Sequence, residues 1–144
     1  MDRAEMDRLI EEHIGAEMAG DTAGAVAMYT DDVVHDVIGF PLGPLQGRAA
    51  AKGFYDHLTA NVRTDRMQER DSWYGEDFCV VEHQCDAAVN GEFLGVPGQG
   101  REVSFRMLHV WEFRDGRISR EVVWLDGGSI MAQLTATADA PAPA

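Results

Sequence analysis

Residues 101–126, REVSFRMLHVWEFRDGRISREVVWLD, decide the fold of this chain. Apolar and polar residues alternate through 101–114 and again through 117–126, which predicts two strands that each bury one face. Asp115-Gly116 separates them and is typical of a tight two-residue turn. The two strands therefore form an antiparallel hairpin, in which residues two apart share one face of a sheet.

Two more strands are predicted upstream of this hairpin, over residues 65–74 and 77–91. Gly75-Glu76-Asp77 and the glycine-rich stretch 95–100 make the connections, which are short enough to join antiparallel neighbours. Before them, apolar spacing and capping residues predict a short strand at 33–38 and three helices, over 2–18, from Asp21 through Tyr29, and over 47–62.

Helices followed by a meander of strands indicate an α+β fold. We expect a single domain over residues 1–134, in which the helices pack on a curved antiparallel sheet and enclose a pocket. Residues 135–144 are mostly Ala, Thr and Pro, which predicts a disordered tail.

The composition excludes several classes of partner and site. The formal net charge of −13 at pH 7 would repel nucleic acid and anionic membranes, so neither is expected as a partner. The first residues are charged and no stretch is apolar enough to cross a membrane, so we expect a cytoplasmic protein. Cys79 and Cys85 lie six residues apart in one predicted strand, which favours buried, unpaired thiols over a disulfide or a metal site.

Alternation along the hairpin selects the side chains that face the helices. In the first strand these are Val103, Phe105, Met107, His109, Trp111 and Phe113. In the second strand we assign Ile118, Arg120, Val122, Trp124 and Asp126 to the same inner face, and Ser119, Glu121, Val123 and Leu125 to the outer face. This assignment places His109 and Asp126 in one apolar hollow, with Trp111 and Trp124 as its walls.

An imidazole and a carboxyl in an apolar hollow are suited to proton transfer. Burial raises the pKa of a carboxyl group, and a neighbouring histidine can exchange or orient the proton. Ordinary structural roles are the alternative, because an Asp at a strand end often caps a turn and a histidine on an apolar face is often a hydrogen-bonded core residue. His13 and His57 lie among charged neighbours, and we assign both to solvated helix faces.

Other side chains are further candidates for the same hollow. His83 and His35 alternate with apolar residues in their strands, and Tyr55 and Tyr29 carry hydroxyl groups that could contact a substrate, although packing alone would also explain them. His35, His83, His109 and Asp126 would suffice for a metal site, but no HxxxH or similar local pair supports one. We expect neither a metal nor another cofactor.

Residues 91–134 resemble the SnoaL-like polyketide cyclases of the nuclear-transport-factor-2-like superfamily. The similarity lies in the Gly-x-Phe-x-Gly-x-Pro segment at 91–97, in Gly100-Arg101-x-Val103, in the hairpin around Asp115-Gly116, and in Asp126 ten residues after Gly116. The upstream order of two helices, Tyr29-Thr30-Asp31-Asp32-Val33-Val34 and a helix opened by Gly47 is also similar.

The resemblance implies a cone-shaped fold and a cofactor-independent acid/base enzyme acting on a hydrophobic, carbonyl-bearing small molecule. It implies that Asp126 is the general acid/base, that His109 assists it, and that the protein is a homodimer joined through the outer face of the sheet. The superfamily also contains isomerases, dehydratases, epoxide hydrolases and binding modules without activity, so these remain alternatives. Gly98 and Val122 depart from the family pattern, so the substrate does not follow from it.

Overall fold

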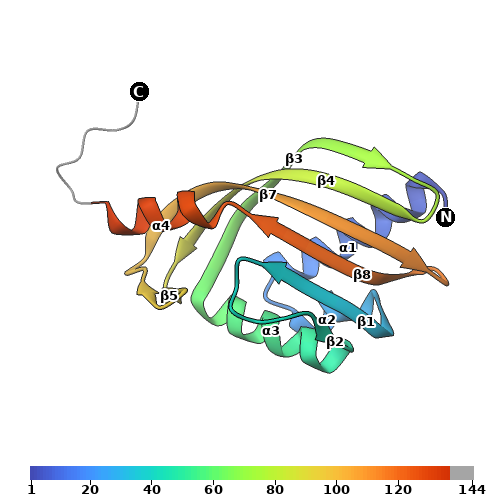
Figure 1. The fold of residues 1–144 in the computed structure, drawn as a ribbon, viewed down its shortest axis with the longest axis horizontal. Coiled ribbons are helices and arrows are strands. Elements are labelled where there is room, and N and C mark those ends of the chain that lie inside the picture. The colour runs from blue at the N-terminus through green and yellow to red at the C-terminus, as the bar shows by residue number, and fades with distance from the viewer. Residues whose placement is uncertain (137–144) are drawn as a thin grey trace.

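A curved six-stranded sheet, in the order β2-β1-β8-β7-β4-β3, forms the body of the molecule (Figure 1). The computed structural model describes residues 1–136. Its elements are α1 (Arg3–Met18), α2 (Thr22–Ala27), β1 (Tyr29–Ile38), β2 (Leu45–Gln46), α3 (Arg48–Asn61), β3 (Val62–Tyr74), β4 (Phe78–Val89), β5 (Glu92–Phe93), β6 (Val96–Pro97), β7 (Arg101–Arg114), β8 (Arg117–Leu125) and α4 (Gly127–Thr135).

The predicted α+β architecture is confirmed, and β3, β4, β7 and β8 form the expected antiparallel meander. The sheet is mixed rather than wholly antiparallel, because β1 pairs with β8 in parallel. Tyr29 begins β1 instead of ending α2. The helix α4 was not predicted, and Thr135, the first residue of the predicted tail, is its last residue. Residues 137–144 lie outside the described part of the chain.

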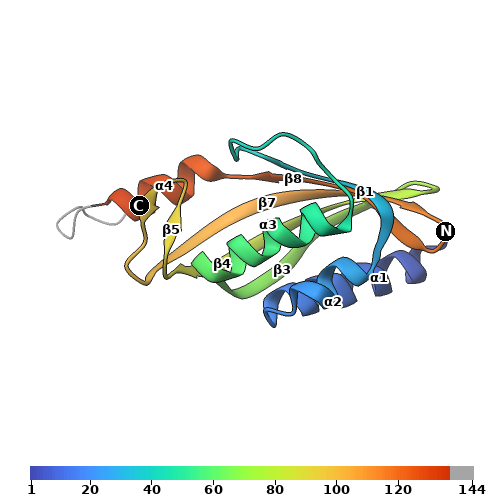
Figure 2. The same ribbon diagram turned by 90° about the horizontal axis from the view of Figure 1, so that it is seen from below.

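Helices α1, α2 and α3 lie on the concave side of the sheet, and α4 lies at its end (Figure 2). Asp2 accepts a hydrogen bond from the backbone of Glu5 and so caps α1, whose buried side carries Met6, Leu9, Ile10 and His13. Helix α3 buries Ala51, Phe54 and Tyr55 on its inner side. Both helices therefore cover the curved sheet with apolar stripes and add a few polar side chains to its interior.

The turn between β7 and β8 forms as the sequence predicts. Asp115 and Gly116 both have positive φ angles, 53° and 71°, as a tight hairpin turn requires of its two central residues. Cys79 and Cys85 are free and buried, as predicted. Among residues 1–136, no helix is both long and apolar enough to cross a membrane.

One irregularity in β8 decides which of its side chains face the helices. Phe113 of β7 pairs with Ile118, but Glu112, one residue earlier in β7, pairs with Arg120. Strand β8 therefore contains one extra residue, Ser119, which makes a β-bulge. The extra residue reverses the alternation of side chains for the rest of the strand.

The bulge corrects the predicted faces of β8. Beyond it, Glu121, Val123 and Leu125 face the helices and line the interior cavity. Trp124 is 53% exposed, and Asp126 is also exposed at the start of α4. The prediction that Trp124 and Asp126 point inward is wrong, because it continued a strict two-residue alternation from Ile118 through the bulge.

Candidate active site

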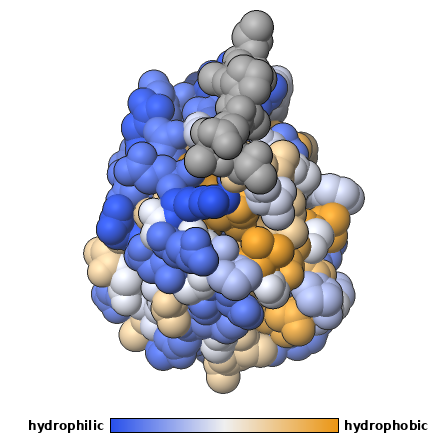
Figure 3. Space-filling model, turned by 90° about the vertical axis from the view of Figure 1, so that its left-hand side faces the viewer, coloured by the Kyte–Doolittle hydropathy of each residue, from blue (hydrophilic) through white to orange (hydrophobic). Residues whose placement is uncertain are grey.

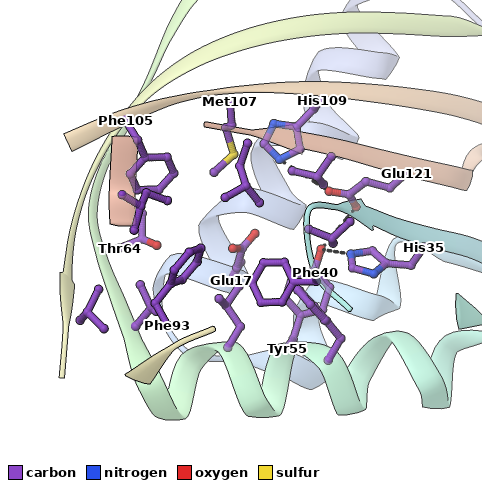
Figure 4. A pocket seen from close by; sticks show the side chains of 18 of the residues that line it. Glu17, His35, Phe40, Tyr55, Thr64, Phe93, Phe105, Met107, His109 and Glu121 are labelled. Carbon is purple, nitrogen blue, oxygen red and sulfur yellow. Dashed lines mark hydrogen bonds and ion pairs between the residues drawn. The ribbon is translucent and has the colours of Figure 1, made fainter. Parts of the chain in front are cut away.

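A cavity lies between α3, α1 and the concave face of the sheet, and its space is about 650 Å³ when its opening to solvent is included (Figure 4). Most of its wall is apolar, and the side chains of four phenylalanines contribute to it: Phe40, Phe54, Phe93 and Phe105. The polar lining residues with ionisable side chains are Glu17, His35, Tyr55, His109 and Glu121. A cavity that combines an apolar wall with a few polar groups is the usual form of a small-molecule site.

Glu121 is the centre of a buried hydrogen-bond network. Its side chain is 1% exposed, and its Oε2 atom accepts a short hydrogen bond from the hydroxyl of Tyr29. His13 Nε2 lies 3.3 Å from the same oxygen, and the hydroxyl of Tyr55 lies 3.4 Å from it. Tyr55 also contacts His35 Nε2 at 3.1 Å. The network fixes the orientation of Tyr55 and Glu121 in the cavity wall.

His13 and Glu121 form a buried ion pair. Burial alone would lower the pKa of His13, but the carboxylate of Glu121 outweighs burial and raises it to about 9. Burial opposes ionisation of Glu121, and the charge and hydrogen bond of His13 outweigh it, so the pKa of Glu121 lies well below its usual value. His13 Nδ1 donates to the carbonyl oxygen of Ala25 at 3.0 Å, so both ring nitrogens have partners.

Glu17 has a different environment from Glu121. It extends from α1 into the cavity, where its carboxyl group points toward the interior in Figure 4. Its nearest ionic partner is His13 Nε2, at 4.0 Å, and its side chain is 12% exposed. Burial raises the pKa of Glu17 to about 7. The charge of His13, the next largest effect, lowers this pKa, and the smaller effect of Glu121 raises it. A carboxyl group of this kind exchanges a proton readily near neutral pH.

His109 is an uncharged imidazole in the cavity wall. Burial lowers its pKa to about 3, although Glu121 acts in the opposite direction. Its ring stacks on Trp111 with centroids 4.5 Å apart, and its Nδ1 atom lies 3.2 Å from Nδ1 of His83. Nε2 lies 3.7 Å from Glu121 Oε1, which favours a proton on Nε2. His83 then donates to Nδ1, and His109 presents an N–H group beside the cavity.

The structure separates the predicted site residues into three groups. His35, His109, Tyr55 and Met107 line the cavity. Buried side chains that contact this group from behind, without lining the cavity, are Tyr29, His83 and Trp111. Trp124 and Asp126 lie outside it, on the outer face and at the start of α4. Asp126 accepts a hydrogen bond from the backbone of Ser129 and caps that helix.

Sequence reasoning missed three charged residues of this site. Strict alternation turns Glu121 outward because it does not contain the bulge, and the predicted solvated face for His13 is wrong, since His13 is fully buried. No sequence pattern used above points to Glu17. A signal was present for two of them: His13 and Glu17 are four residues apart on α1, so they share one face of the helix. No group of three or more His, Cys, Asp or Glu within residues 1–136 is arranged to hold a metal ion.

Solved structures with the same architecture support the assignment of the fold. A candidate polyketide cyclase from Xanthomonas campestris pv. campestris superposes with a TM-score of 0.80 and 22% sequence identity over 92% of this chain and 98% of that one. TsrD from Streptomyces laurentii superposes with a TM-score of 0.81 and 20% sequence identity over 95% of this chain and 99% of that one. An LEH-like epoxide hydrolase from M. tuberculosis superposes with a TM-score of 0.71 and 18% sequence identity over 91% of this chain and 90% of that one.

A helix-lined cone with an interior cavity is the architecture of the nuclear-transport-factor-2-like proteins, and this chain has that fold. The family model of the SnoaL-like domain matches residues 10–121. The chain therefore belongs to the SnoaL-like family. No curated protein matches it in sequence.

Proposed function

We propose that this protein is a cofactor-independent acid/base enzyme that removes a proton from the carbon beside a carbonyl group in an apolar small molecule. The position of Glu17 carries the proposal: a carboxyl group with a pKa of about 7 extends into a largely apolar cavity beside neutral imidazoles. Cyclisation, isomerisation and elimination of water next to a carbonyl all begin with this step, which is consistent with a SnoaL-like fold.

Glu17 is better suited than Glu121 to accept the proton. Glu121 already accepts hydrogen bonds from its buried partners, and its lowered pKa makes it a weak base. In the proposed step the Glu17 carboxylate takes the proton, and the electrons of the broken C–H bond form an enolate. The N–H of His109 donates to the enolate oxygen, while the charge of His13 offsets that of Glu121.

Exchange with heavy water tests the proposed step without knowledge of the natural substrate. A panel of apolar ketones is incubated with the protein in D₂O, and deuterium at the carbon beside the carbonyl is measured by mass spectrometry. We expect the unmodified protein to accelerate exchange of at least one ketone. Glu17→Gln should slow it by about 100-fold or more, because a general base contributes at least that much.

Glu11→Gln is the matched control, because Glu11 is an exposed residue of the same helix and its replacement changes the net charge equally. It should exchange at the unmodified rate. Equal exchange by Glu17→Gln and the unmodified protein would exclude Glu17 as the base. A ketone that binds the unmodified protein with no exchange in any member of the panel would support a binding module without activity.

A further inference from the structure

When Glu17 is ionised, the cavity contains one negative charge that no positive charge within it balances. His13 is the cation nearest Glu121, and it is engaged with that carboxylate at 3.3 Å. His35 and His109 are buried imidazoles whose pKa values are lowered by burial, so both are neutral at pH 7. Glu17 remains, at 4.0 Å from His13 and without a hydrogen-bond donor among the described residues. Lys and Arg are absent from the described residues that line the cavity.

We propose that Glu17 makes this cavity selective by charge, so that the part of a ligand held inside it is uncharged or carries a protonated amine and is not a carboxylate or phosphate. The inference rests on the proposed function in that it takes the same cavity as the binding site. It adds a substrate class to that function and a role for Glu17 that does not depend on any reaction.

An anionic group would lose its hydration in this cavity without gaining a partner. A buried charge without a counter-ion is among the costliest arrangements in a protein interior, and Glu17 and Glu121 would add repulsion. The outside of the molecule acts in the same direction, because a net charge of −13 disfavours the approach of anions and favours that of cations.

A protonated amine would find two kinds of favourable contact. The carboxylate of Glu17 can accept a charge-assisted hydrogen bond from it, in a site where water competes weakly. The same cavity wall carries aromatic rings, including Phe40 and Phe93 (Figure 4), and the face of an aromatic ring attracts a cation. An uncharged ligand needs neither contact and is accommodated by the apolar wall.

Three probes with the same ring system and different head groups test this selectivity: 1-naphthylmethylamine, 1-naphthylmethanol and 1-naphthoate. Calorimetric titration at pH 8, where Glu17 is mostly ionised, should give the tightest binding for the amine, by about tenfold over the alcohol, and the weakest for the carboxylate. The advantage of the amine should shrink at pH 6, where Glu17 is mostly protonated and the amine keeps its charge.

Glu17→Gln should abolish the advantage of the amine and improve binding of the carboxylate, while the affinity for the alcohol stays within about threefold. Glu11→Gln should leave all three affinities unchanged. Equal affinity of the unmodified protein for the carboxylate and the alcohol would overturn the inference. So would identical shifts in the two variants, which would assign the effect to the general charge of the molecule, or failure of both the amine and the alcohol to bind.

The probes also separate this inference from the proposed function. None has an acidic carbon beside a carbonyl, so a protein that never removes a proton would still show the order of affinities. If Glu17→Gln loses deuterium exchange but the order of affinities is absent, the selectivity is wrong and the proposed chemistry stands. If the order is present and exchange does not depend on Glu17, the selectivity stands alone.

Discussion

His13 and Glu17, four residues apart on α1, couple the stability of the fold to pH. The pKa of His13 is raised from 6.5 to about 9, so its stabilising protonation is fully present below pH 6.5 and is lost as the pH rises through 9. The pKa of Glu17 is raised from 4.5 to about 7, so its contribution is full below pH 4.5 and is lost as the pH rises through 7. Both contributions decrease on the alkaline side.

We therefore expect the free energy of unfolding to fall between pH 6.5 and pH 9, and His13→Asn to flatten this decrease. Urea unfolding at a series of pH values measures the effect. His57→Asn is the control, because His57 is exposed on α3 and its replacement should leave the pH dependence unchanged. Glu121→Gln should flatten the same decrease, since Glu121 raises the pKa of His13. A decrease that persists in both variants would contradict the assignment.

At the scale of single elements, Asp126 has a structural role between β8 and α4, because it caps the start of α4. Its carboxylate accepts a hydrogen bond from the backbone N–H of Ser129 at 3.0 Å, as a helix cap does. We expect Asp126→Ala to lower the free energy of unfolding by about 1 kcal/mol and to leave deuterium exchange unchanged. Asp126→Asn keeps a capping oxygen and should retain most of the stability. Loss of exchange in Asp126→Asn at full stability would restore Asp126 as a catalytic candidate.

Alternation and turn chemistry predict most of the elements, because each depends on local sequence. The strands at β3, β4, β7 and β8 and the inner face of β7 follow directly from these patterns. The parallel pairing of β1 with β8 depends on how distant segments meet, so local patterns do not contain it. The faces of β8 could not be predicted either, since Ser119 differs in no obvious way from a residue that pairs normally.

The same distinction applies to the site. His109, His35 and Tyr55 could be placed in the cavity from their alternation or helical spacing with apolar residues. His13 and Glu121 could not, because a charged side chain is expected at the surface unless a buried partner is known. Each is the partner that permits the burial of the other, and they lie on α1 and β8, far apart in the sequence.

At the scale of the whole molecule, the outer face of the sheet is the region to test for self-association. Trp124 is 53% exposed there, and Leu108, its pairing partner in β7, is partly exposed beside it. Apolar side chains also gather at the end of the molecule near α4 and β5 (Figure 3). An exposed apolar patch favours association when a second copy can cover it.

We expect a homodimer through this outer face and dissociation into monomers of 15.8 kDa when Trp124 is replaced by Glu. Light scattering coupled to gel filtration measures both masses. Trp73→Glu is the matched control, because Trp73 is equally exposed, at 52%, but lies on β3 at the edge of the sheet. A monomeric unmodified protein would rule out the dimer, and a dimer that survives Trp124→Glu would place the contact elsewhere.

The extra residue in β8 determines how mutations in this strand can change the wall of the cavity. Ser119 is the unpaired residue of the bulge, and the identity of every inward side chain from Glu121 onward depends on its staying unpaired. Loss of the Ser119 codon would leave Ile118 and Arg120 adjacent, as their partners Phe113 and Glu112 are, so Glu121 would stay inward. A change that instead made Ser119 pair with Glu112 would turn Arg120, Val122 and Trp124 inward, so the pairing of one residue separates two different cavity walls on an unchanged scaffold.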